Sequence, residues 1–98
     1  MFYLSQILNS RVEDSADEMV GRLSDLLIKP KAGEYSPLVY AVIKSKNKYF
    51  FIPYTQIEIL SPSEVSLKVL KEKIETEEIN ENDFTFLKRD VLDQQIVD

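Results

Sequence analysis

Four acidic residues near the start of the chain have the clearest potential for chemistry: Asp14, Asp17, Glu18 and Asp25. Two carboxyl groups at a suitable separation can hydrolyse a glycosidic bond, one as the acid and the other as base or nucleophile. The first three of these residues are expected around an exposed turn, where no burial raises a carboxyl pKa. A small domain also has little room for a deep pocket beside its core. The pattern therefore favours surface carboxylates over a catalytic pair.

Composition narrows the chemistry further. The chain has 98 residues, with 12 Lys and Arg, 17 Asp and Glu, and a net charge of −5. It contains no His and no Cys, which excludes a Ser–His–Asp triad, a thiol nucleophile, a disulfide framework and ordinary zinc sites. We therefore expect one small acidic domain that is not an enzyme, with no catalytic residue and no cofactor.

The acidic charge is concentrated in residues 72–83. This segment holds six acids and one base, so its net charge equals that of the whole chain, −5. A solvated linker or short helix is the favoured interpretation. The alternative is weak binding of a divalent cation such as Mg²⁺ by carboxylate oxygens, although no calcium-loop pattern is present. The weak candidate ligands are Glu75, Glu77, Glu78, Glu81 and Asp83.

Other partners are disfavoured by the remaining pattern. Lys44, Lys46 and Lys48 alternate but flank an expected hairpin turn, and they do not form the basic stripe that nucleic acid requires. The longest apolar run, residues 38–43, is far shorter than the ~20 residues of a membrane span. The first residues lack the basic start of a secretory signal. We expect a cytoplasmic domain, either alone or as the soluble part of a membrane-associated protein.

Alternating and β-branched residues predict a mainly β fold. Gly21 within the second strand indicates a bulge or a close backbone approach. Residues 30–37 are expected to form a loop, 46–48 a turn, and 70–76 a short helix. Pro53 indicates an edge or a bulge. The expected strands are residues 11–14, 19–28, 38–45, 49–54, 56–60, 65–69 and 84–87.

Residues 61–64 fit either a helix start or a turn between strands, and the alternation after them favours the turn. Closing such short strands removes exposed edges, so we predict a small, partly closed antiparallel β-barrel with a short helix and an extended C-terminal tail. Ile57 and Ile59 are expected on one face. The predicted core residues are Val12, Val20, Leu23, Leu26, Val39, Ala41, Ile43, Ile57, Val65 and Leu67.

The chain repeats itself at its end. Residues 5–14 align without gaps to residues 89–98, which indicates that a second copy of the unit begins there. The tail would then have lost its pairing strands and would either dock on a second copy, as a two-fold dimer, or stay disordered. Exposed Phe2, Tyr3, Tyr49 and Tyr54 are further candidates for a contact patch. The tail residues expected to make the contact are Val91, Leu92, Ile96 and Val97.

Three segments carry a family resemblance. LSQILNSRVED at residues 4–14, VGRLSDLL at 20–27 and FIPYTQI at 51–57 resemble PRC-barrel domains over about residues 3–69. The family usually has Gly in the first hairpin turn where this chain has Asp17, a residue that tolerates positive φ. The resemblance implies residues 1–71 as the PRC-barrel-like domain, 72–83 as an acidic linker or short helix, and 84–98 as a final strand and a truncated second repeat.

The tail LKRDVLDQQIVD at residues 87–98 resembles a segment that links two barrel units in bacterial proteins continuing into MgtE-type magnesium-transporter intracellular domains. The family also supplies the cytoplasmic domain of the reaction-centre H subunit and a domain of the ribosome-maturation factor RimM. The resemblance implies a non-catalytic protein-docking module at the N-terminus of a longer protein. It leaves two alternatives: a regulatory domain linked to magnesium transport, responding weakly to Mg²⁺ through residues 72–83, and a RimM-like adaptor.

Overall fold

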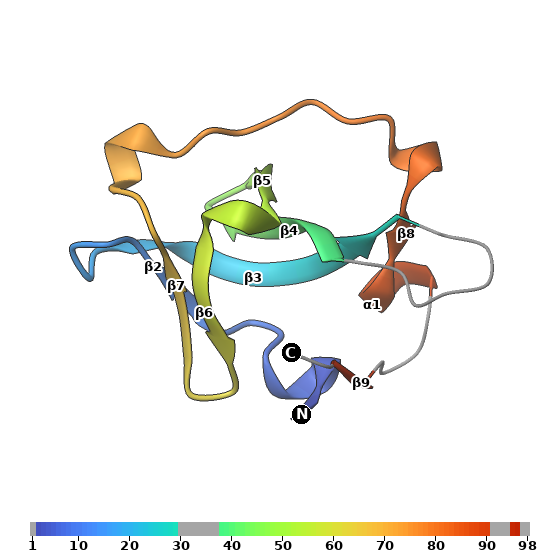
Figure 1. Ribbon diagram of the computed structural model, residues 1–98, viewed down its shortest axis with the longest axis horizontal. Coiled ribbons are helices and arrows are strands. Elements are labelled where there is room, and N and C mark those ends of the chain that lie inside the picture. The colour runs from blue at the N-terminus through green and yellow to red at the C-terminus, as the bar shows by residue number, and fades with distance from the viewer. Residues whose placement is uncertain (1, 30–37, 91–94, 97–98) are drawn as a thin grey trace.

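The computed structural model describes residues 2–29, 38–90 and 95–96 (Figure 1). Seven strands form one sheet in the order β5-β4-β3-β2-β7-β6, with β8 paired to β3 beside this path. These strands are β2 (Arg11–Glu13), β3 (Met19–Ile28), β4 (Leu38–Ser45), β5 (Lys48–Pro53), β6 (Ile57–Ser61), β7 (Glu64–Leu67) and β8 (Thr85–Phe86). The remaining elements are β1 (Phe2–Tyr3), β9 (Gln95–Ile96), the 3₁₀ turns η1 (Leu4–Gln6), η2 (Tyr54–Gln56), η3 (Lys71–Lys73) and η4 (Glu81–Asp83), and the helix α1 (Leu87–Asp90).

The sheet curls into a partly closed barrel, which confirms the predicted fold class. Its two edge strands, β5 and β6, are joined by η2, and they are not paired with each other within the described residues. Strand pairing is antiparallel except between β2 and β7, which lie parallel. That parallel pair differs from the wholly antiparallel prediction, because the chain passes through β4 and β5 before it returns beside β2.

The barrel interior holds the main core. Eight of the ten predicted core residues are buried, while Val20 and Val39 are half-buried. The sequence interpretation missed Leu4 and Ile7, which η1 and its end place in the interior at 1% and 0% exposure. It also missed five other buried residues: Leu27, Val42, Ile52, Phe86 and Leu87.

A second, smaller cluster lies on the outer face of β3, β4 and β5. Leu27, Val42 and Phe86 form its buried centre. Residues 72–83, here called the strap, arch across the top of Figure 1 from η3 to η4, and Ile79 of the strap packs on this cluster. The strap is therefore attached to the barrel rather than freely solvated. Two edge-to-face aromatic contacts complete the cluster, Tyr40–Phe84 with ring centroids 5.4 Å apart and Phe51–Phe86 at 6.3 Å.

Gly21 is required by a close approach between β3 and β4. A Cβ atom at this position would lie 2.5 Å from the carbonyl oxygen of Lys44, closer than real Cβ contacts allow. The β2–β3 register also shifts between Val12 and Glu13. Both features expected at Gly21, a bulge and a close approach, are thus present. Asp17 has φ 64°, as expected for the residue that replaces the turn glycine.

Other local expectations divide between confirmation and correction. The turn interpretation of residues 61–64 is confirmed, because Ser61 pairs with Glu64 across a two-residue connection. Pro53 is the last residue of the edge strand β5, also as expected. The shared face of Ile57 and Ile59 is wrong: a register shift between them leaves Ile57 8% and Ile59 38% exposed. The helix expected over 70–76 is only the three-residue η3.

The two ends of the described chain meet. Phe2–Tyr3 pairs antiparallel with Gln95–Ile96, so the backbone of these two tail residues is paired within the same chain, against the expectation of an unpaired tail. The loop expected over 30–37 and the tail residues Val91, Leu92 and Val97 lie outside the described residues. Among the described residues, no helix is long and apolar enough to cross a membrane.

Candidate binding site

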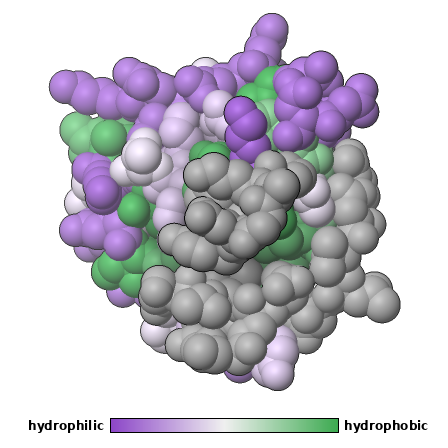
Figure 2. All heavy atoms as spheres, turned by 45° about the vertical axis from the view of Figure 1, so that its right-hand side comes forward, coloured by the Kyte–Doolittle hydropathy of each residue, from purple (hydrophilic) through white to green (hydrophobic). Residues whose placement is uncertain are grey.

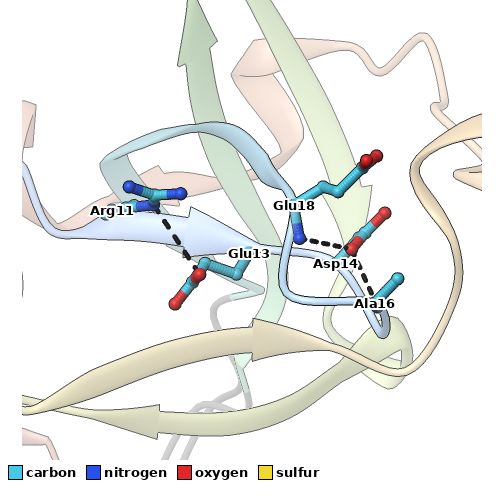
Figure 3. Close-up of polar contacts among 5 residues, drawn as sticks. All are labelled: Arg11, Glu13, Asp14, Ala16 and Glu18. Carbon is cyan, nitrogen blue, oxygen red and sulfur yellow. Dashed lines mark hydrogen bonds and ion pairs between the residues drawn. The ribbon is translucent and has the colours of Figure 1, made fainter.

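Asp14 is buried, not exposed as the sequence suggested. The residue is 1% exposed. Its carboxylate folds back into the β2–β3 turn, where Oδ1 accepts hydrogen bonds from the backbone N–H groups of Ala16 at 2.8 Å and Glu18 at 2.9 Å (Figure 3). This turn differs from a simple surface loop because the aspartate side chain supplies its internal hydrogen bonds. Asp17 and Glu18 are exposed, as expected.

The second oxygen of Asp14 reaches a distant part of the chain. Oδ2 accepts a hydrogen bond from the backbone N–H of Lys71 at 2.8 Å, at the start of η3. The hydrogen bond from Glu18 is the largest cause that lowers the pKa of Asp14, and burial opposes it; the N–H groups of Lys71 and Ala16 and the charge of Lys71 lower the pKa further. A carboxylate held in its ionised form by three N–H donors is suited to fastening backbone rather than to donating a proton.

Asp25 holds the chain beyond the strap, at the start of α1. It is 5% exposed, and its Oδ1 accepts hydrogen bonds from the backbone N–H groups of Leu26 and Lys88, each at 2.7 Å. Two of the four acidic residues considered as candidates for chemistry, Asp14 and Asp25, are thus buried and hold backbone N–H groups in place. One fixes the chain just before the strap and the other fixes it just after β8.

The strap acids are dispersed. All five weak candidate ligands are exposed, and the described residues contain no group of three or more acids that could hold a metal ion. Glu77 instead accepts a hydrogen bond from the hydroxyl of Tyr40, and its N–H donates to the carbonyl of Phe51 at 3.1 Å. The carbonyl of Glu75 accepts from Gln56 Nε2 at 3.2 Å. The upper rim of the molecule, where the strap runs, is correspondingly hydrophilic in Figure 2.

Five cations surround a groove on the outer face of the sheet. The groove has a volume of about 580 Å³. No Asp or Glu of the described chain lines it, although the protein is acidic overall. The cations, all exposed, are Arg22, Lys44, Lys46, Lys71 and Lys88.

Strand register places the centre of this basic groove. Arg22 of β3 lies directly opposite Lys44 of β4, which lies opposite Tyr49 of β5. Directly opposed residues share one face of a sheet, and like charges in that position are destabilising. Arg22 donates from Nη1 to the carbonyl of Asn9 at 2.8 Å, and Lys44 Nζ lies 5.7 Å from the Tyr49 ring centroid. Between described residues the one ion pair is Arg11–Glu13 at 3.7 Å, so no such pair neutralises the groove.

The sequence interpretation missed the basic groove. The alternation of Lys44, Lys46 and Lys48 by itself indicates no more than lysines beside an ordinary hairpin turn. Arg22 becomes their neighbour only through the pairing of β3 with β4. Lys71 and Lys88 are held near them by hydrogen bonds from their backbone N–H groups to Asp14 and Asp25. The alternation was the only local signal, because the other three cations are distant in sequence.

An apolar hollow of about 560 Å³ adjoins the basic groove. The two share Ser24, Tyr49 and Lys88 as lining residues. Val42, Phe51 and Phe86 form the apolar part of the lining of the hollow, so the outer cluster is incompletely covered on this side. The acids Asp25 and Glu81 line the hollow as well.

Among the aromatic candidates, Tyr49 and Tyr3 are 55% and 50% exposed. Tyr54 is half-buried against the main core, and the side chain of Phe2 is outside the description. Tyr49 is therefore the exposed aromatic residue that adjoins both the groove and the hollow.

Comparison with known proteins places the fold in a family. No curated protein matched the chain. The sequence model of the PRC-barrel domain family matches residues 1–83. These residues span η1, the β2–β3 hairpin, all the barrel strands up to β7, and the strap. This domain is a non-enzymatic module in general. The match covers most of the 98 residues, and the chain therefore belongs to the PRC-barrel family.

Proposed function

We propose that this PRC-barrel domain is a non-enzymatic protein–protein interaction module, and that it contacts its partner through the outer face of β3, β4 and β5 around Tyr49. The observation that carries the proposal is the pairing of a basic groove with an apolar hollow, with Tyr49 shared by both. Exposed aromatic residues beside apolar pockets and charged rims are typical of interface centres.

The arrangement of the carboxylates supports a non-enzymatic role. Both carboxylate oxygens of Asp14 and the Oδ1 atom of Asp25 accept hydrogen bonds from backbone N–H groups. A general acid near neutral pH needs a raised pKa, whereas the pKa of Asp14 is lowered. We do not extend the proposal to magnesium, because no three acids of the described residues come together as metal ligands. We also do not extend it to ribosome maturation, which no particular contact favours.

The proposal is tested by comparing two exposed apolar side chains. Tyr49→Ala removes the residue at the centre of the proposed face, and Ile59→Ala is the control because Ile59 is also exposed and lies on β6, outside the groove and the hollow. Each 98-residue variant is immobilised, and the proteins that it captures from a lysate are quantified by mass spectrometry. We expect one stoichiometric partner whose capture falls about tenfold with Tyr49→Ala and is unchanged with Ile59→Ala. Equal capture by both variants would overturn the proposed face.

A second copy of the chain is also proposed as a partner. β9 pairs with β1 through only two residues, so the same pairing can form between two copies by exchange of the tail. We expect light scattering at rising concentration to give a dimer mass for the wild type and a monomer mass for Ile96→Pro, which removes one N–H from β9. A monomer mass for the wild type throughout would contradict this part of the proposal.

A further inference from the structure

We infer that the basic groove binds an acidic protein segment and that the adjoining hollow takes an apolar side chain of the same segment. The inference rests on the proposed function and adds the chemistry of the partner. Five cations line the groove and no acid of the described chain accompanies them. Because the molecule as a whole carries a charge of −5, this local excess of positive charge is opposite to the average surface.

The fold holds these cations together at a cost that a ligand would relieve. Arg22 and Lys44 oppose each other directly on one face of an antiparallel pair, an arrangement that is destabilising for like charges. Nothing in the packing of the barrel requires either charge, since both side chains are exposed. Arg22 reaches toward Asn9 and Lys44 toward Tyr49, so an acidic segment that crosses both strands would place a separate carboxylate beside each cation.

Hydrogen bonds within the protein also fix parts of the groove before any ligand binds. The Asp14 clamp fixes the backbone of Lys71 and the Asp25 clamp fixes that of Lys88. Arg22 is oriented by its hydrogen bond to the carbonyl of Asn9, which leaves most of its five N–H donors for a ligand. Positions fixed before binding lower the entropic cost of ordering the site.

A carboxylate-bearing peptide fits this surface better than a nucleic acid or free phosphate. Four of the five cations are lysines, and they come from β4, the β4–β5 turn, η3 and α1. A long polyanion following the groove past Lys71 would meet the strap, whose net charge is −5. Val42, Phe51 and Phe86 in the adjoining hollow give an apolar side chain a place to pack, and the acids Asp25 and Glu81, which also line it, would repel a phosphate there.

The test uses fluorescence anisotropy with the 98-residue protein and a labelled octapeptide in which Glu alternates with Leu. The probes for comparison are the Gln–Leu and Glu–Ser octapeptides, an oligothymidylate of equal length, and inorganic phosphate as a competitor. We expect Arg22→Ala/Lys44→Ala to weaken binding of the Glu–Leu peptide about tenfold. The control Lys48→Ala/Lys73→Ala removes the same charge from exposed residues outside the groove and should change affinity less than about twofold.

A second variant guards against misfolding of the first. Lys46→Ala/Lys88→Ala leaves the hydrogen bonds from the backbone N–H groups to Asp14 and Asp25 intact. It should weaken binding of the Glu–Leu peptide to a similar extent. Weaker binding of both the Gln–Leu and the Glu–Ser peptide than of the Glu–Leu peptide supports a site in which the groove takes the acidic side chains and the hollow takes an apolar one. Tighter binding of oligothymidylate, displacement by phosphate at equal charge concentration, or equal effects of groove and control variants would each overturn the inference. If Tyr49→Ala still lowers partner capture about tenfold in that case, the proposed function stands and only the partner chemistry is wrong.

Discussion

The two faces of the β3–β4–β5 sheet are built in different ways. The inner face is sealed: Leu23, Ala41 and Ile43 are all 0% exposed and pack within the barrel core. The outer face of the same strands is covered only in part, by Ile79 of the strap and by Phe84 and Phe86 that follow it, and beyond that cover lie the apolar hollow and the basic groove.

This difference separates stability from recognition within one sheet. Because side chains alternate between the faces of a strand, each strand can supply the core with one set of residues and the surface with the next. The inner set is constrained by close packing. The outer set has room to retain charges that packing does not use, and we expect substitutions on the two faces to differ accordingly.

The largest effect is expected on the inner face. Leu23→Ala should lower the free energy of unfolding by about 3 kcal/mol, because it removes buried methyl groups and leaves a cavity. Ile59→Ala, at a partly exposed position on β6, should cost about 0.5 kcal/mol or less. Chemical denaturation of both variants measures the difference. A cost below about 1 kcal/mol for Leu23→Ala would mean that the interior is not the stabilising face.

A smaller effect is expected on the outer face. Phe86→Ala should cost about 2 kcal/mol, less than the usual value for a phenylalanine in a full core, because neighbours in this open cluster can relax into the space. Hydrogen exchange should show the Glu77 N–H, which is bonded to the Phe51 carbonyl, losing protection before the amides of β3. Equal loss of protection across both would show that the faces unfold as one unit.

The Asp14 clamp gives the outer face a response to acid. Its folded pKa is lowered from 3.8, so its stabilising contribution is present above pH 3.8 and is lost as the pH falls below that value toward the folded pKa. We expect acid titration by circular dichroism to show a loss of stability in this range that Asp14→Asn reduces. At neutral pH the same variant should be less stable than the wild type, because its amide cannot satisfy the Lys71 N–H equally well. An unchanged acid transition would contradict the clamp.

The smallest effect is expected where the strap crosses Tyr40. Tyr40→Phe removes the hydroxyl that donates to Glu77 and should cost about 0.5 kcal/mol, since the contact is open to solvent. The hydrogen bond to Glu77 is the main cause that raises the pKa of Tyr40 above 10.0. The contribution of Tyr40 is therefore present below pH 10.0 and lost as the pH rises through the folded pKa. Stability of the wild type and Tyr40→Phe should converge at high pH in urea titrations.

Features that depend on neighbouring residues were readable from the sequence. Alternation of apolar and polar residues placed the hairpins and eight of the ten predicted core residues, because side chains of a strand alternate whatever lies around it. Gly21 indicated a close backbone approach and Asp17 a turn residue with positive φ, because few other residues tolerate either situation. Composition also excluded whole classes of catalysis without any structure.

Features that depend on distant residues were decided by the tertiary structure. Asp14 looked like a surface residue because its partner Lys71 is 57 positions away, and Asp25 meets Lys88 across 63 positions. The bulge after Ile57 reversed the face of Ile59 through pairing with β7. The basic groove likewise draws its cations from β3, β4, η3 and α1 and from the β4–β5 turn. The local pattern indicates which side chains share a face of an unbroken strand, but strand pairing decides where a bulge changes that face. Strand pairing and the folding of the strap also decide which charges become neighbours.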